Sequence, residues 1–168
     1  RLSHINVACN SASQEHLIRS GGGHRPALYL PNFIDESRFD ATKESPERKR
    51  GGPILRALYV GGLTKAKGVF DAVKVAELSE QFELTLFAPS MTEEFHALKG
   101  KLPGNVFVRI GLSHEDLVRA YWDHDLLLFL SYQEGFPLSV TEAMAMGLPV
   151  LATRVGAVPD MIEESKGG

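Results

Sequence analysis

Two glutamates, Glu134 and Glu142, stand eight residues apart in a segment that follows the most apolar run of the chain. Carboxylates can act as general acids or bases, or they can accept hydrogen bonds from the hydroxyl groups of a bound ligand. On one continuous helix this spacing would separate the two groups by about 12 Å, so they do not form a simple catalytic pair. With a loop between them, the two carboxylates could instead bind two parts of an elongated ligand whose phosphate lies at a helix N-terminus.

Each glutamate also has a purely structural interpretation. Residues 139–142 (S-V-T-E) match a capping box, in which Glu142 would only accept a hydrogen bond from a backbone N–H. Glu134 can equally be an exposed acid of a loop. The residues alone leave both alternatives open.

A second candidate site is the segment 61–68 (G-G-L-T-K-A-K-G), which joins a predicted strand to a predicted helix. Gly61 and Gly62 allow close backbone approach, and the start of a helix offers N–H groups to an anion. Lys65 or Lys67 can add a positive charge there. The segment is not a Walker loop, because no Gly-Lys-Ser/Thr closes it. The alternative interpretation is an ordinary turn with two solvated lysines.

Other chemistries find little support in the residue pattern. The histidines show no i, i+4 pair with a third ligand nearby, so we expect no metal site. Ser139 is not part of a Gly-x-Ser-x-Gly elbow, which argues against a serine hydrolase. The single cysteine, Cys9, excludes an internal disulfide and favours a reducing compartment.

The elements around these segments must position them. Short apolar runs alternate with amphipathic stretches, a pattern typical of a parallel sheet covered by helices. The predicted strands are residues 5–9, 27–30, 54–60, 82–88, 105–110, 125–130 and 149–153. The predicted helices are residues 13–19, 68–80, 92–100 and 137–146, with a further helix capped by residues 113–116. Because ligands bind beyond the carboxyl ends of parallel strands, both candidate segments lie where a ligand is expected.

Composition excludes several classes of protein. The chain has 168 residues, enough for one sound core, and a formal net charge of −3 with scattered basic residues, which argues against nucleic acid as a partner. The most apolar run, residues 126–130, is far shorter than the roughly 20 residues of a membrane helix, and no signal peptide is visible. Because the chain opens on Arg1 and ends in a turn-like segment at residues 165–168, we expect a piece of a longer protein that lacks a closing helix.

Several segments together resemble a known family. Residues 134–150 (E-G-F-P-L-S-V-T-E-A-M-A-M-G-L-P-V) resemble the two-glutamate signature of GT-B-fold glycosyltransferases of family 4, the glycosyl transferase group 1 type. Residues 31–35, 59–68 and 152–160 resemble further segments of that family, in the same order along nearly the whole chain. The resemblance implies an α/β fold: a Rossmann-like open parallel sheet with helices on both faces, which forms one half of a GT-B fold.

The resemblance also implies a function. It indicates a retaining glycosyltransferase that moves a sugar from a nucleotide-sugar donor to an acceptor, with no metal or other cofactor. Residues 1–39 would be the tail of the N-terminal, acceptor-side half, residues 40–52 a linker, and residues 53–168 the domain that binds the nucleotide sugar. A sugar, lipid-linked or polysaccharide acceptor would bind the missing N-terminal half, so we expect weak nucleotide binding and little catalysis by the chain alone. The expected location is cytoplasmic, including the inner face of a membrane with which the full protein would associate peripherally.

The family's residue roles can be carried over by position. Glu134 would contact the donor sugar and Lys67 would neutralise the departing diphosphate, so these two are the expected catalytic residues. Glu142 would bind the ribose hydroxyls, and the backbone of Gly111 and Leu112 would hold the base. The remaining expected donor-binding residues are Gly61, Gly62, Lys65, Gly135, Phe136, Pro137, Leu138 and Ser139, of which the amides of Phe136, Leu138 and Ser139 would face the diphosphate.

Two departures from the family pattern leave alternatives open. Gly62 stands where the family has Arg, and Lys65 would replace it without the bidentate geometry of a guanidinium. Residues 88–90 (A-P-S) stand where the family has a glycine-rich loop. One alternative is therefore a degenerate, non-catalytic module that binds a sugar nucleotide or a partner protein. Another is a glycosidase or phosphorylase-like enzyme, which would need its two carboxyl groups about 5–9.5 Å apart.

Overall fold

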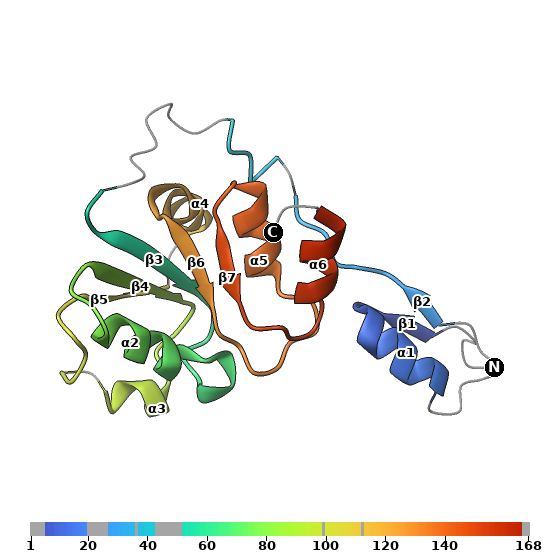
Figure 1. Cartoon of the computed structure of the whole chain (residues 1–168), viewed down its shortest axis with the longest axis horizontal. Helices are drawn as coiled ribbons and strands as arrows, with labels where there is room; N and C mark the ends of the chain where they lie inside the picture. The colour runs from blue at the N-terminus through green and yellow to red at the C-terminus, as the bar shows by residue number, and fades with distance from the viewer. Residues whose placement is uncertain are drawn as a thin grey trace.

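The computed structural model describes residues 6–19, 27–35, 37–42, 52–98, 100–111 and 113–165. Its main feature is a five-stranded, all-parallel sheet with the strand order β5-β4-β3-β6-β7 (Figure 1). These strands are β3 (Leu55–Val60), β4 (Phe82–Ala88), β5 (Val106–Ile110), β6 (Leu126–Phe129) and β7 (Val150–Ala152). A smaller parallel sheet pairs β1 (Asn6–Ala8) with β2 (Ala27–Tyr29) and carries α1 (Ser11–Arg19).

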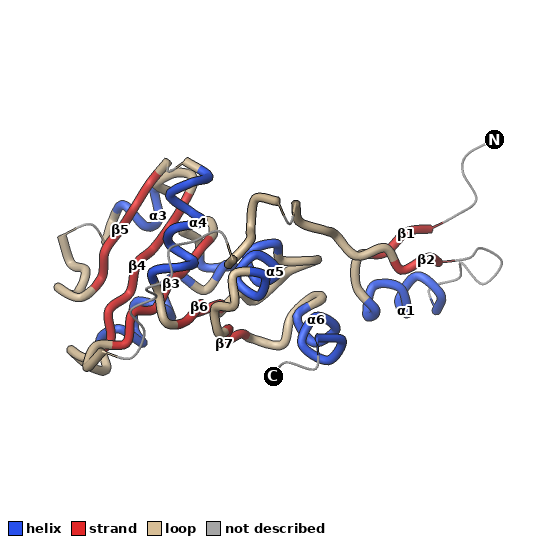
Figure 2. The backbone as a smooth tube through the Cα atoms, turned by 90° about the horizontal axis from the view of Figure 1, so that it is seen from above, coloured by secondary structure: helices blue, strands red, loops and turns tan. Residues whose placement is uncertain are grey.

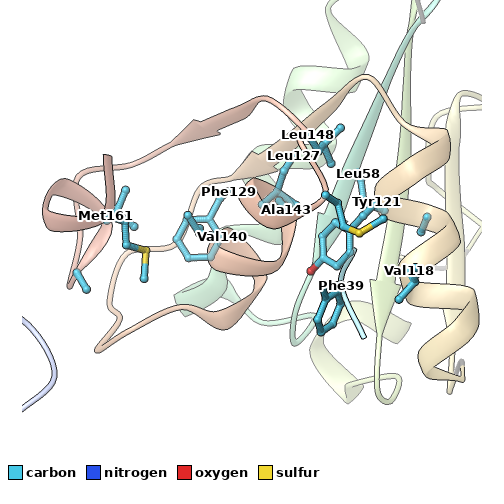
Figure 3. Close-up of a cluster of buried hydrophobic side chains, with 14 residues drawn as sticks. Phe39, Leu58, Val118, Tyr121, Leu127, Phe129, Val140, Ala143, Leu148 and Met161 are labelled. Atoms are coloured by element: carbon cyan, nitrogen blue, oxygen red, sulfur yellow. The ribbon is translucent and has the colours of Figure 1, made fainter. Parts of the chain in front are cut away.

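Helices cover both faces of the larger sheet (Figure 2). The helices are α2 (Val69–Glu77), α3 (Glu93–His96), α4 (His114–Asp123), α5 (Leu138–Ala145) and α6 (Val158–Ser165), with a short 3₁₀ turn at Lys65–Lys67. Because successive side chains of a strand point to opposite faces, β3 contributes to two cores. Leu58 packs in the core formed with α4, α5 and α6, whereas Ala57 and Tyr59 pack in the core formed with α2 and α3 (Figure 3 shows the first).

The strand order creates a switch point between β3 and β6. From β3 the chain moves outward through β4 to β5, and it then crosses back to place β6 on the other side of β3. Loops that leave the carboxyl ends of two such neighbouring strands diverge, and the crevice between them is the usual ligand site of an open α/β sheet. The loops concerned are the two candidate segments, residues 61–68 after β3 and residues 131–137 after β6.

The predicted fold class is confirmed, and each strand lies inside its predicted range. The helices differ more: α3 is a single turn, and α6 was not predicted at all. The apolar residues Val158, Met161 and Ile162 of α6 follow helical spacing and pack in one core, so a signal for this helix was present. Leu112 and most of the predicted linker, residues 43–51, lie outside the described residues.

The segment after β2 returns to the larger domain. Phe39 is buried, with its ring centroid 4.9 Å from that of His114 and 6.1 Å from that of Tyr121, both in α4. The end of the predicted N-terminal tail therefore packs in the core of the larger domain. Among the helices that the structure describes, none combines the length and apolar character needed to cross a bilayer.

Candidate functional site

The two candidate segments meet through an ion pair. The Nζ atom of Lys67 lies 2.7 Å from Oε1 of Glu134, and the two side chains are 39% and 11% exposed. Glu134 is therefore not an exposed loop acid. Lys67 is paired rather than fully solvated, whereas Lys65 is exposed, so the alternative of two solvated lysines is wrong for Lys67 alone. The pair lies at the switch point, where each loop leaves its strand.

Backbone contacts bring the two loops together. The Tyr132 N–H donates to the carbonyl of Ala66 at 2.9 Å, and the hydroxyl of Ser131 donates to the same oxygen at 3.2 Å. Gly68 has a φ of +72°, and a Cβ atom there would lie 2.0 Å from the carbonyl oxygen of Leu130. Only glycine fits this position, because a larger residue would be strained in its backbone and would collide with Leu130, the residue after β6.

The side chain of Tyr59 contacts the backbone of the loop formed by residues 61–68. Its hydroxyl donates to the carbonyl of Gly62 at 2.7 Å and lies 3.2 Å from the carbonyl oxygen of Lys67. Burial, and after it the negative charge of Glu134, raise the pKa of Tyr59 well above its ordinary value. The phenol therefore stays protonated and remains a hydrogen-bond donor to the loop.

Helix α5 begins directly after the loop that carries Glu134. It begins at Leu138, with Pro137 as its N-cap and no side chain capping its first N–H groups. The capping box suggested by residues 139–142 is therefore not formed, because Pro137 starts the helix too early for Ser139 to serve as the cap. An uncapped helix start carries partial positive charge and unpaired N–H groups, which favour an anion.

Glu142 has a partner that the sequence did not reveal. Its Oε2 atom accepts a hydrogen bond of 2.7 Å from the hydroxyl of Tyr121, which is fully buried in α4. Burial, followed by the charge of Glu142, raises the pKa of Tyr121. Tyr121 is a buried residue of α4, and the spacing of apolar residues along a helix does not predict the partner of a phenol oxygen.

A pocket of about 250 Å³ lies at the carboxyl ends of β3 and β4 and against the start of α4. Its lining is mainly apolar and consists of Val60, Gly61, Phe87, Ala88, Pro89, Ser113, His114 and Leu117. Leu117 precedes Tyr121 by one turn of α4, so the pocket and the Glu142–Tyr121 contact share one face of that helix. Gly111 follows β5, and its N–H donates to the carbonyl of Ala88 in the pocket lining at 3.1 Å.

The remaining predicted donor-binding residues differ in their exposure and in their contacts. Lys65 is exposed, and its backbone N–H points to a carboxylate oxygen of Glu94 at 3.4 Å. Gly62 has open space where a side chain would begin. Pro137 is buried, Phe136 and Ser139 are partly buried, and Leu138 is exposed. Among the residues described, no group of three or more His, Cys, Asp or Glu is arranged to hold a metal ion.

A third loop, between β7 and α6, supports the Glu134 loop. Gly156 has a φ of +55°, and a Cβ atom there would lie 2.5 Å from the carbonyl oxygen of Gly135 and 2.6 Å from that of Glu134. The N–H of Ala157 donates to the Gly135 carbonyl at 2.8 Å. The Thr153 hydroxyl also donates to the carbonyl of Ser131 at 2.5 Å. The backbone around Glu134 is therefore held from its far side by this third loop.

The fold and these converging loops define an α/β domain with an open parallel sheet and a candidate site at its switch point. Residues 40–168 match the model of the family described as Glycosyl transferases group 1, and the chain belongs to that family.

Curated relatives agree with this assignment. The chain is 33% identical over 144 residues to the putative teichuronic acid biosynthesis glycosyltransferase TuaC of Bacillus subtilis, covering 79% of this chain and 34% of that protein. It is 30% identical over 145 residues to N-acetyl-alpha-D-glucosaminyl L-malate synthase of Bacillus anthracis, covering 82% of this chain and 38% of that protein. The chain thus spans little more than a third of the length of these relatives.

Solved structures show the same fold. The sucrose-phosphate synthase of Thermosynechococcus elongatus superposes with a TM-score of 0.79 at 22% identity, over 96% of this chain and 43% of that one. WaaG, a glycosyltransferase involved in lipopolysaccharide biosynthesis, superposes with a TM-score of 0.76 at 22% identity, over 95% of this chain and 47% of that one. The predicted half of a GT-B fold is confirmed.

Proposed function

We propose that this chain binds the nucleotide-sugar donor of a retaining glycosyltransferase and needs no metal ion to do so. The observation that carries the proposal is the Lys67–Glu134 ion pair, which places one cation and one anion at the switch point where the two loops meet. A donor of this kind presents both a charged diphosphate and a hydroxyl-rich sugar. Lys67 can contact the charged diphosphate, and Glu134 can accept hydrogen bonds from the sugar hydroxyls.

The diphosphate would rest on the uncapped start of α5 with Lys67 beside it. When the bond between sugar and diphosphate breaks, negative charge grows on the departing phosphate. A helix N-terminus and a lysine already aimed at that charge lower the barrier, and one such fixed donor contributes about 3 kcal/mol. In this scheme Lys67 exchanges Glu134 for a phosphate oxygen when the donor arrives.

The two glutamates would orient the rest of the donor. Glu134 accepts hydrogen bonds from sugar hydroxyls, and Glu142 accepts them from the ribose while Tyr121 holds its other oxygen. The base would enter the pocket beside Gly61 and Ser113, next to Gly111. Fixing the donor in this way supplies the positional part of catalysis.

A second candidate function is binding without catalysis. It is favoured by Gly62, since the arginine of the family is absent there and one positive charge that would contact the phosphate is missing. A glycosidase is less favoured, because Glu134 is paired with a lysine and Glu142 with a phenol rather than both flanking one open site.

The acceptor is proposed to be a sugar, a lipid-linked sugar or a polysaccharide, bound by a further domain. The name of the TuaC relative, which refers to teichuronic acid biosynthesis, supports a polymer, and the reaction would take place in the cytoplasm or at the inner face of a membrane. Little turnover is proposed for the isolated chain, and sugar transfer by these residues alone would contradict this.

Isothermal titration of the chain with UDP, GDP and ADP, and with their glucose or mannose derivatives, tests donor binding. We expect one nucleotide series to bind and Lys67→Met to weaken that binding by about tenfold or more. Lys101→Met is the matched control, because Lys101 is exposed and lies outside both loops. If no nucleotide binds, or if both variants weaken binding equally, the proposal is wrong.

A further inference from the structure

The β1–α1 turn contacts the Glu134 loop across 125 residues of sequence. Asn10, which is only 3% exposed, donates from Nδ2 to the carbonyl oxygen of Gly135 at 3.1 Å. Its other side-chain atom, Oδ1, accepts the N–H of Ser13 at 2.7 Å and so caps α1. One amide therefore joins the start of a helix in the small sheet unit to the residue next to Glu134.

A second contact lies beside the first. The N–H and the hydroxyl of Ser11 donate to the two carboxylate oxygens of Asp160, at 2.9 and 2.7 Å. Asp160 belongs to the first turn of α6, and Figure 1 shows α6 beside α1. A carboxylate is favoured at a helix N-terminus, so Asp160 stabilises the start of α1 from the other domain.

These contacts matter because α1 has no buried residue of its own. Directed hydrogen bonds from Asn10 and Ser11 join the turn that precedes α1 to the larger domain, and the Cys9 sulfur lies close to Gly135. The Gly135 carbonyl accepts from Asn10 on one side and from the N–H of Ala157 on the other. The backbone at Glu134 is thereby held between the small sheet unit and the β7–α6 loop.

We propose that Asn10 is a positioning residue for Glu134. The Ser11–Asp160 contact holds the turn that carries Asn10 in place. This inference rests on the proposed function, in which Glu134 contacts the donor sugar. Asn10 touches no part of the donor in this scheme. It fixes the path of the loop so that the Glu134 carboxylate, which is paired with Lys67 in the free chain, faces the sugar once the donor is bound.

Asparagine suits this position because it supplies an acceptor and a donor from one short side chain. Aspartate would cap α1 equally well, but it would turn a carboxylate oxygen toward the Gly135 carbonyl. Asn10→Asp therefore removes the contact to the loop while it keeps the helix cap. Gln14→Leu is the matched control, because it removes only the hydrogen bond from Gln14 to the carbonyl of Ala27 within the small unit.

The test uses the whole chain and two measurements. The first is amide hydrogen exchange at Ala157, whose N–H is bonded to the Gly135 carbonyl. The second is the ratio of affinities for a nucleotide sugar and its nucleoside diphosphate, measured by calorimetry with UDP-glucose and UDP and with the guanosine and adenosine counterparts. We expect Asn10→Asp to speed exchange by about tenfold and to lower the ratio by a similar factor, while diphosphate affinity is kept.

The outcomes separate this inference from the proposed function. If the wild-type chain binds nucleotide and Asn10→Asp leaves both the exchange rate and the affinity ratio unchanged, the positioning role is wrong and the function stands. If Gln14→Leu produces the same changes, the effect is a general loosening and the inference is also wrong. If no nucleotide binds the wild type, the proposed function fails, and the exchange rate alone decides whether Asn10 holds the loop.

Discussion

Lys67 and Glu134 lie 67 residues apart in the chain, yet their side chains form an ion pair with 2.7 Å between Nζ and Oε1. The pair forms because β3 and β6 are neighbours in the sheet, although β4 and β5 separate them in sequence. Each residue lies in the loop that leaves one of these strands. The pair is partly exposed on the lysine side, so a ligand can reach the cation.

Replacing Glu134 by Gln should separate the sugar contact from the phosphate contact. The amide keeps the shape of the side chain but removes its charge, so Lys67 is no longer paired and remains available to phosphate. We expect affinity for the nucleoside diphosphate to stay equal or rise, and affinity for the nucleotide sugar to fall about tenfold. Calorimetry checks both values. Glu80→Gln, an exposed residue beyond α2, should change neither, and a loss of diphosphate affinity in Glu134→Gln would contradict the assignment.

Gly62→Arg should strengthen binding of the diphosphate. A Cβ at Gly62 meets nothing within 4 Å, so a side chain can begin there without a clash. A guanidinium adds a bidentate contact to phosphate, and we expect an affinity gain of about tenfold that shrinks at high salt. Gly104→Arg adds the same charge where space is equally open, at the other end of the sheet. An equal gain in both variants would show that only net charge matters.

Tyr121→Phe should lower both stability and nucleotide affinity. The change removes the buried hydroxyl that donates to Glu142, and the loss of such a bond costs about 1 kcal/mol of unfolding free energy. Glu142 also loses the group that orients it, so nucleotide affinity should fall a few-fold. Thermal unfolding and calorimetry measure the two effects. Tyr132→Phe, which removes a hydrogen bond to Asp71 from a largely exposed phenol, should affect stability little.

Gly156→Ala should destabilise the fold by more than about 2 kcal/mol. The backbone at Gly156 is left-handed, and the added Cβ would meet two carbonyl oxygens of the Glu134 loop at 2.5 and 2.6 Å. Gly104→Ala is the control, because a Cβ there meets nothing within 4 Å. Urea unfolding compares the two variants. Equal stability of both variants would mean that a Cβ at Gly156 does not clash with the carbonyl oxygens of the Glu134 loop.

Acidification should destabilise the domain partly through His124. Burial, despite the hydrogen bond to the carbonyl of Ala120, lowers its pKa in the folded state, where Arg56, Asp123 and Asp125 are the charged groups around it. As pH falls below about 6.5, the unfolded chain takes up the proton first, so the free energy of unfolding decreases until the folded pKa is passed.

Urea unfolding from pH 7.5 to 5.5 measures this loss. We expect the slope to be flatter in His124→Gln than in the wild type. His16→Gln is the control, because His16 is exposed on α1. Equal slopes in the wild type and in His124→Gln would contradict the assignment.

The elements of the larger sheet were predictable because their signal is local. The apolar run of β6 and the amphipathic pattern of α4 report how each segment is buried, whatever its neighbours are. The same is true of the two loops, whose glycines, lysines and glutamates follow strands in the sequence. The residues left the capping box at 139–142 open as an alternative, and the structure excludes it, because the helix starts at Leu138 after Pro137.

The sequence by itself therefore determined the class of fold and the two segments that could carry a site. Tertiary structure alone decided the partners: Lys67 for Glu134, Tyr121 for Glu142 and Asn10 for the Gly135 carbonyl. The physical reason is that the alternation of buried and exposed residues is a local property of one segment. A polar contact, in contrast, depends on the order of the strands and on the paths of loops far apart in the chain.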